Sequence, residues 1–148
     1  MSLLEKLNDD LKTAMKAGER ERVDVLRFSL SGVNAALKDK VMKKEGTTLT
    51  DEEVITVLQK DAKRRKEAIE LFKQGKRDDL VKKEEADMKV IMSYLPQELS
   101  AAEIERTIDD LRKKGFNDFN SLMREAMKVM KGRADGKTVG DAIKKKLG

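Results

Sequence analysis

Apolar residues recur at intervals of three and four along nearly the whole chain, and a single proline interrupts this spacing. The series that begins with Leu3, Leu7 and Leu11 is typical, and it closes near Gly18. This interval places apolar side chains on one face of an α-helix, and glycine commonly follows the last turn. One proline and nine glycines are too few for a turn-dense all-β fold. The sequence therefore predicts an all-α fold class.

Seven segments show the helical pattern, and several begin with a residue suited to capping. Thr50 and Glu53 have the spacing of a capping box, in which a hydroxyl and a carboxylate satisfy free amides at a helix start. Asp78 and Asp135 can cap two further helices through their carboxylates. The predicted segments run from Leu3 to Gly18, Val23 to Gly46, Thr50 to Gly75, Asp78 to Pro96, Ser100 to Gly115, Phe119 to Gly132, and Asp135 to Leu147.

The sharpest break in the pattern is LPQELS at residues 95–100, which holds the only proline. Proline disfavours a helical conformation in the residue before it, and Ser100 with Glu103 then forms a second capping box. We predict a domain boundary here. An N-terminal multihelical domain of about four helices would occupy residues 1–96, and a small three-helix domain residues 97–148.

Charge is dense but unevenly distributed. Residues 1–99 contain 21 Lys or Arg and 20 Asp or Glu, whereas residues 100–148 contain 12 and 8. Most of the net charge of +5 therefore lies in the last third of the chain. A basic surplus of this kind favours a partner that is a polyanion.

Several classes of chemistry are disfavoured by what the chain lacks. It contains no histidine and no cysteine, which removes the usual general base, the commonest metal ligand and the thiol nucleophile. Acidic pairs such as Asp9-Asp10 fall early in helices or on charged faces, where solvated carboxylates are ordinary. Neither a dinucleotide-binding motif nor a phosphate-binding loop occurs. We expect no catalytic residue, no metal site and no cofactor.

Targeting and membrane segments are also not expected. Apolar runs stop at four residues or fewer, and acids appear within the first ten residues. A membrane span needs about 20 apolar residues, and a secretory signal needs an apolar central region. The simplest expectation is a soluble cytoplasmic protein without a membrane partner.

The run KRRK at residues 63–66 suggests a nucleic-acid patch at first sight. Consecutive helical residues are about 100° apart, so these four side chains spread around the helix and cannot form one patch. Arg65 projects onto the apolar stripe, one turn after Asp61. We predict that these two form a partly buried ion pair that tethers the helix to a neighbour.

The region from 124 to 137 is a stronger candidate for a binding surface. Arg124, Lys128 and Lys131 share a narrow arc opposite the apolar side of their helix, and no acid interrupts that stripe. Arg133 and Lys137 follow in the turn, where the first amides of the next helix could receive a phosphate. The candidate nucleic-acid contacts are Arg124, Lys128, Lys131, Arg133, Lys137, Lys144 and Lys145.

An ordinary structural explanation competes with this interpretation. Lysines 144–146 favour the negative end of the last helix, and Gly132 is a common type of helix stop. Spacing alone leaves both explanations open. If RNA binds, the scarcity of aromatic residues favours recognition of its backbone and shape over base stacking.

Two stretches carry a resemblance to a known family. GKRDDLVKKEEADMKVIMSYLPQELSAAEIE, from Gly75 to Glu105, resembles the characteristic segment of the YqeY family. MREAMKVMKGRADGKTVGDAIKKKL resembles the C-terminal tail shared by that family and the B subunit of the glutamine-dependent aminoacyl-tRNA amidotransferase. Two residues depart from the pattern: Asp87 stands where Glu is expected, and Gly136 stands where the amidotransferase tail tends to have Pro.

The resemblance implies an all-α bacterial protein with a multihelical domain followed by a three-helix tail domain. In the amidotransferase the tail helps to hold tRNA, while a much larger body carries out the chemistry. Family similarity thus suggests a carbon–nitrogen ligase component with glutamine as amido donor, but the residues do not support that chemistry in this chain alone. We interpret the chain as a tRNA-binding or tRNA-associated accessory protein. The alternatives are an adaptor for an amidotransferase or an aminoacyl-tRNA synthetase and, ranked last, an enzyme subunit.

Overall fold

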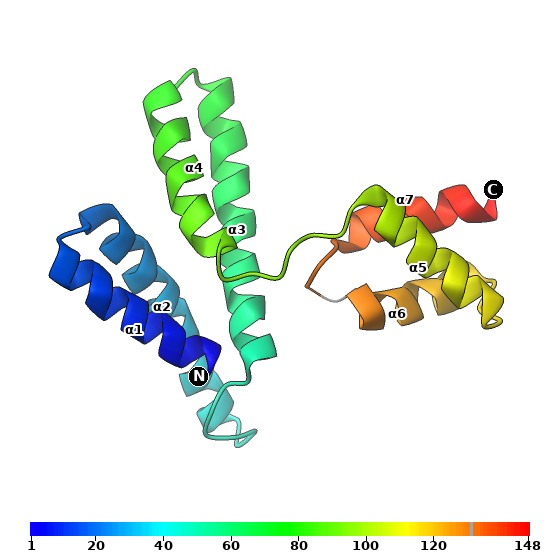
Figure 1. Cartoon of the computed structure of the whole chain (residues 1–148), viewed down its shortest axis with the longest axis horizontal. Coiled ribbons are helices and arrows are strands. Elements are labelled where there is room, and N and C mark those ends of the chain that lie inside the picture. The colour runs from blue at the N-terminus through cyan, green and yellow to red at the C-terminus, as the bar shows by residue number, and fades with distance from the viewer. Residues whose placement is uncertain (131) are drawn as a thin grey trace. The chain divides into compact units, whose positions relative to one another are not determined.

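The computed structural model describes residues 1–130 and 132–148, and the regular structure in these residues is entirely helical (Figure 1). The predicted all-α fold class is confirmed. The helices are α1 (Leu3–Ala17), α2 (Arg20–Met42), α3 (Asp51–Gln74), α4 (Asp78–Met92), α5 (Ala101–Lys113), α6 (Phe119–Met130) and α7 (Gly136–Leu147). None of the helices in the described residues is long and apolar enough to cross a membrane.

The chain divides into two compact units, which we call unit 1 (Met1–Leu95) and unit 2 (Pro96–Gly148). Unit 1 contains α1 to α4, and unit 2 contains α5 to α7. That each unit is a domain that folds by itself, with the boundary after residue 96, stays a prediction.

Local capping explains where several helices begin and end. Thr50 and Glu53 form the expected capping box at the start of α3. An equivalent box of Ser2 and Glu5 opens α1, although the sequence analysis did not identify it. At the other end of α1, Gly18 takes a left-handed conformation with φ of 70°, which glycine adopts without a steric penalty.

Two expectations about helix ends were wrong. Asp78 does not cap α4; the cap position is Arg77, which makes no side-chain cap bond, and Asp78 lies in the first turn. An acid there is favoured by the positive end of the helix without making a cap. The second helix ends at Met42 and not at Gly46. Gly46 instead lies in the following loop against Lys40, whose Nζ is 2.6 Å from Glu53 Oε1.

Unit 1 consists of two helical hairpins, α1–α2 and α3–α4, which Figure 1 shows side by side in each pair. Helix α2 joins them, because it packs against α1, α3 and α4. The core is aliphatic, and burial of this apolar surface supplies the main driving force for packing. Its fully buried side chains include Leu7, Leu26, Val33, Leu58 and Ile91.

Unit 2 is a three-helix assembly in which every pair of helices is in contact. The predicted caps are confirmed here: Ser100 forms a capping box with Glu103, and Asp135 accepts a bond from the amide of Thr138. The core is again apolar, and its fully buried side chains include Ile108 and Leu122. Unlike unit 1, unit 2 has no buried charged side chain among its described residues.

Candidate nucleic-acid interface

Helix α6 presents two cations outward. Its buried residues, Leu122, Ala126 and Met130, recur at intervals of four and define the face that packs on the core. Arg124 and Lys128 therefore lie on the other side, and each side chain is 65% exposed. The third predicted member of this arc, Lys131, lies outside the described residues. Two exposed cations one turn apart can contact neighbouring phosphates.

An acid does reach this stripe, contrary to the sequence analysis. Glu125 Oε1 lies 3.3 Å from Lys128 Nζ and 3.9 Å from Arg124 Nε. Glu125 starts about 100° around the helix from Arg124, but its side chain is long enough to reach both cations. Exposed ion pairs of this kind contribute little, about 0–1 kcal/mol, so an incoming phosphate can replace the carboxylate.

Arg133 has a structural contact that spacing did not reveal. Its Nε donates to the carbonyl oxygen of Gln97 at 3.1 Å, and its own carbonyl oxygen accepts from the amide of Leu99 at 2.8 Å. The two bonds attach the turn before α7 to the segment before α5. The amide of Ser100 lowers the pKa of Glu103, and Arg133 adds to that effect. The exposed Arg133 therefore helps to hold the fold of unit 2, whether or not it also contacts a ligand.

The start of α7 is less open to a phosphate than predicted. Asp135 Oδ1 accepts from the amide of Thr138 at 2.8 Å, and Oδ2 accepts from its hydroxyl at 2.9 Å. One of the first amides of the helix is thus already satisfied by a carboxylate. Lys137 is exposed next to this cap, and Asp141 lies one turn after it. Any phosphate near this turn would depend on lysine side chains more than on backbone amides.

The remaining candidates lie at the other end of α7. Lys144 and Lys145 are both exposed. Lys144 Nζ lies 5.8 Å from the centre of the ring of Phe119. Phe119 is the first residue of α6. Because α6 and α7 pack together, the predicted cations lie on two adjacent helices and the turn between them. We call this set the α6–α7 basic surface; its described members are Arg124, Lys128, Arg133, Lys137, Lys144 and Lys145.

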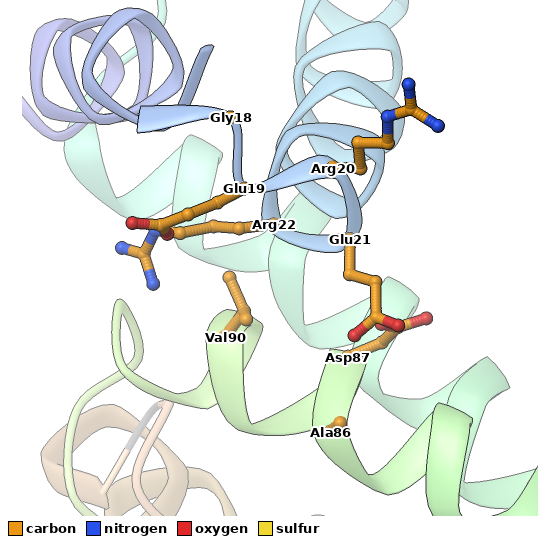
Figure 2. Close-up of a pocket in the computed structure, with 8 residues that line it drawn as sticks. All are labelled: Gly18, Glu19, Arg20, Glu21, Arg22, Ala86, Asp87 and Val90. Atoms are coloured by element: carbon orange, nitrogen blue, oxygen red, sulfur yellow. The ribbon is translucent and has the colours of Figure 1, made fainter. Parts of the chain in front are cut away.

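Unit 1 contains a groove of about 550 Å³ that the sequence did not indicate (Figure 2). It lies between the turn Gly18–Arg22 and the α4 residues Ala86, Asp87 and Val90. Figure 2 shows the Arg20 guanidinium pointing away from α4, while the Glu21 side chain points toward Asp87. Its lining mixes two arginines with three acids. The groove therefore has no uniform charge that would favour a ligand of one sign.

Next to this groove lies a buried ion cluster. Arg65 Nε is 3.2 Å from Asp61 Oδ1, as predicted, and the Arg65 side chain is only 13% exposed. Its Nη1 also lies 3.1 Å from Glu84 Oε2 and 3.3 Å from Asp87 Oδ2, both on α4. Ser29 of α2 donates its hydroxyl to Asp61 Oδ2 at 3.2 Å. The prediction of a tethering ion pair is confirmed, and the α4 carboxylates that extend it were missed.

This cluster is structural in character. Asp87 of α4 is one of its buried members. No buried side-chain nitrogen or oxygen in the described residues lacks a hydrogen-bond partner. No group of acids in the part of the chain that the structure describes is arranged to hold a metal ion. The cluster thus explains packing between helices and does not indicate a reaction.

Comparison with known proteins identifies relatives over the whole chain. A family model described as Yqey-like protein matches residues 4–147. A Pyrenophora tritici-repentis protein named "Altered inheritance of mitochondria protein 41, mitochondrial" is 30% identical over 155 residues. That match covers 99% of this chain and 81% of the relative.

Shorter matches lead to other fungal proteins. An uncharacterized Schizosaccharomyces pombe protein is 33% identical over 90 residues, which cover 61% of this chain and 69% of that protein. A Lachancea thermotolerans protein, also named altered inheritance of mitochondria protein 41, is 35% identical over 107 residues. The match covers 71% of this chain and 55% of that relative, which is a longer protein. Because the family model spans nearly the entire sequence, the chain belongs to the YqeY family.

Proposed function

We propose that unit 2 binds a folded RNA of the tRNA type through the α6–α7 basic surface. The observation that carries the proposal is the outward position of Arg124 and Lys128 on α6, opposite the buried face of that helix. The basic surplus of residues 100–148 supports it, because these cations add to a net positive region. Lysine and arginine on a helix surface contact phosphates without reading bases.

The proposed role is that of an accessory protein and not of an enzyme acting by itself. The resemblance of the tail to the amidotransferase B subunit supports tRNA as the RNA, with an amidotransferase or an aminoacyl-tRNA synthetase as a protein partner. A carbon–nitrogen ligase reaction, if the chain takes part in one, would need the catalytic body of such a partner. We propose the cytoplasm as the compartment; the fungal relatives carry "mitochondrial" in their names.

Equilibrium binding of tRNA at several salt concentrations tests the proposal. Changing Arg124, Lys128 and Lys137 together to Gln should weaken binding and flatten its salt dependence, by roughly 0.7–0.9 log units per lost phosphate contact. The matched control changes three exposed lysines of unit 1 to Gln. These control positions are Lys12, Lys16 and Lys38.

Lys40 is unsuitable as a control because it is paired with Glu53. The helical content by circular dichroism should be unchanged in both triple variants, since surface substitutions usually cost within about 0.5 kcal/mol. Equal losses from the two triples would mean that only net charge matters. Absence of tRNA binding by the parent protein at low salt would also contradict the proposal.

An adaptor that binds protein is the second candidate, and one observation favours it. Val129 of α6 is 63% exposed and directly follows Lys128. An apolar side chain beside cations is typical of protein interfaces as well as of isolated surface residues. Affinity capture from cell extract with and without RNase separates the two functions. Partners that are retained after RNase treatment favour the adaptor, and partners that are lost favour RNA.

A further inference from the structure

Phe28 on α2 is an aromatic side chain with an unexplained exposed surface. It is 54% exposed, whereas Phe116 and Phe119 pack against the core of unit 2. The guanidinium of Arg65 lies over its ring, 5.4 Å from the centre. This cation–π contact accounts for one side of the ring and helps to cover the buried ion cluster. The exposed remainder has no role in the packing of unit 1.

The contacts between α2 and α3 show what borders this ring. Ser29 bonds to Asp61, and a Cβ atom at Gly32 would lie 3.3 Å from Val57 Cγ1. The residues of α3 that face α2 therefore recur every four positions, at Val57, Asp61 and Arg65. Phe28 is one residue before Ser29 and one turn before Gly32, so it lies along the solvent-exposed edge of this contact.

Helical geometry turns two cations of α3 toward this edge. Lys60 and Arg64 precede Asp61 and Arg65 by one residue, which turns both about 100° away from the core and toward solvent. Both are exposed, and neither forms an ion pair with a described residue. The charge of Arg65 is offset by buried carboxylates, whereas the charges of Lys60 and Arg64 remain available.

The basic residues of this edge are recognised in the sequence only when Arg65, which is partly buried, is left out of the run KRRK. The four residues 63–66 do not share a face, as the helical geometry requires. Lys60, Lys63 and Arg64 do, because they are separated by three and four positions. Glu67 lies one turn further along α3, and Asp24 lies one turn before Phe28 on α2. Because α2 and α3 run antiparallel, both exposed acids lie at the same end of the basic edge, beyond Arg64.

We propose that Phe28, Lys60 and Arg64 form a contact for an unpaired nucleotide of RNA, which we call the α2–α3 nucleotide site. The two cations would hold consecutive phosphates, and the open face of Phe28 would stack on a base. An aromatic side chain beside exposed cations is the arrangement by which single strands are commonly held. The site is in unit 1 and does not depend on the α6–α7 basic surface.

Binding of a labelled single-stranded oligoribonucleotide to the full chain, beside the same strand annealed to its complement, tests the site. Phe28→Leu should weaken single-strand binding roughly 5- to 150-fold, the range for loss of one stacked base. Phe28→Tyr, which keeps an aromatic face, should retain most of the affinity. Duplex binding should be unaffected by either change, because a paired base cannot stack on the ring.

Charge neutralisation supplies the second measurement. Lys60→Gln with Arg64→Gln should reduce the salt dependence of single-strand binding by about 0.7 log units for each lost phosphate. Lys12→Gln with Lys16→Gln is the matched control, since it has the same four-residue spacing and the same charge change on exposed positions of unit 1. Leucine at position 28 also keeps an apolar cover over Arg65, so a loss of binding cannot be assigned to opening of the ion cluster.

Three results would overturn the proposal. If Phe28→Leu binds single-stranded RNA as tightly as the parent protein, no base stacks on Phe28. The exposed edge of the α2–α3 contact would then be an apolar surface suited to a protein segment. Equal losses of affinity from the Lys60 and Arg64 variant and from the Lys12 and Lys16 control would mean that only the net charge of the protein matters. Lack of single-strand binding at low salt would exclude the site directly.

A fourth result would separate the two proposals. If tRNA binding is lost in the Phe28, Lys60 and Arg64 variants but not in the Arg124, Lys128 and Lys137 variant, the α2–α3 nucleotide site is supported and the proposed role of unit 2 is contradicted.

Discussion

The two units use a similar density of charge in different ways. Unit 1 contains 21 basic and 19 acidic residues, and it buries Asp61 and Asp87 against Arg65. Unit 2 contains 12 basic and 9 acidic residues, and no charged side chain in its described part is buried. The comparison indicates that buried charge joins helices in unit 1, whereas in unit 2 the charged contacts between helices, such as Lys146 with Asp109, are only partly buried.

Helix length offers a physical reason for the difference. The longest helices of unit 1, α2 and α3, have 23 and 24 residues, against 12 or 13 for the helices of unit 2. In unit 1 a single long side chain, Arg65 on α3, reaches carboxylates on both α3 and α4. The short helices of unit 2 close around a core of apolar side chains, with the Lys146–Asp109 pair at its margin.

The largest effect is expected from breaking the buried cluster of unit 1. Arg65→Ala would leave the carboxylate of Asp61 buried without its cation, and Asp87 would keep only the exposed Lys83, whose Nζ lies 3.3 Å from its Oδ2. Removal of one partner from such a cluster typically costs about 3–5 kcal/mol of unfolding free energy. Denaturant unfolding followed by circular dichroism measures this change.

The neighbouring exposed Arg64 is the control for that experiment. Arg64→Ala should change the unfolding free energy by no more than about 0.5 kcal/mol. Changing Arg65, Asp61 and Asp87 to Met, Leu and Leu together with Glu84→Gln should recover much of the lost stability, since replacement of a whole buried ion cluster by uncharged residues is often neutral. Equal effects of Arg65→Ala and Arg64→Ala would remove the contrast between the two units.

In unit 2 a large effect should come from an apolar residue instead. Leu122 is fully buried in the core formed by α5, α6 and α7. Leu122→Ala should cost roughly 2–5 kcal/mol through lost burial and the cavity left behind. If the predicted domains fold independently, amide hydrogen exchange should accelerate in residues 97–148 and stay unchanged in residues 1–96. Acceleration throughout the chain would show that the two units unfold together.

Tyr94 is expected to give the smallest effect on stability, with no change of stability around neutral pH, and the most selective spectroscopic signal. Its hydroxyl donates to Asp10 Oδ2 at 2.5 Å and accepts from Arg22 Nη2 at 3.4 Å. Burial and then the Asp10 carboxylate raise the pKa of Tyr94 to about 12. The folded state thus holds the phenolic proton more tightly than the unfolded state, whose pKa is about 10.

The resulting stabilisation should be complete below about pH 10 and should be lost as the pH rises toward about 12. Tyr94 is the only tyrosine and the chain has no tryptophan, so tyrosinate absorbance reports this one group. Asp10→Asn should lower the titration midpoint, because it removes the charge that opposes ionisation. An unchanged midpoint in that variant would exclude the Asp10 contact as a cause.

Most of the fold could be predicted from the sequence because the signals are local. A three- and four-residue apolar repeat determines which face of a helix is buried, and Thr50, Ser100 and Asp135 act on amides within their own turns. Even the Asp61–Arg65 pair could be predicted, since residues four apart on a helix are neighbours. The errors at Asp78 and Gly46 concern helix ends. Arg77, next to Asp78, occupies the cap position of α4, and α2 ends at Met42, before Gly46.

The sequence by itself thus determined an all-α chain with a capped set of amphipathic helices and a basic final third. Tertiary structure decided which charges are available to a ligand. Arg65 pairs with Asp61 on its own helix, but its other two carboxylates, Glu84 and Asp87, are about 20 residues away and are brought close only by the α3–α4 hairpin. The contact of Phe28 with the Arg65 guanidinium likewise exists only because α2 packs against α3. Spacing along one helix carries no information about a neighbouring helix, so these features had to come from the packed structure.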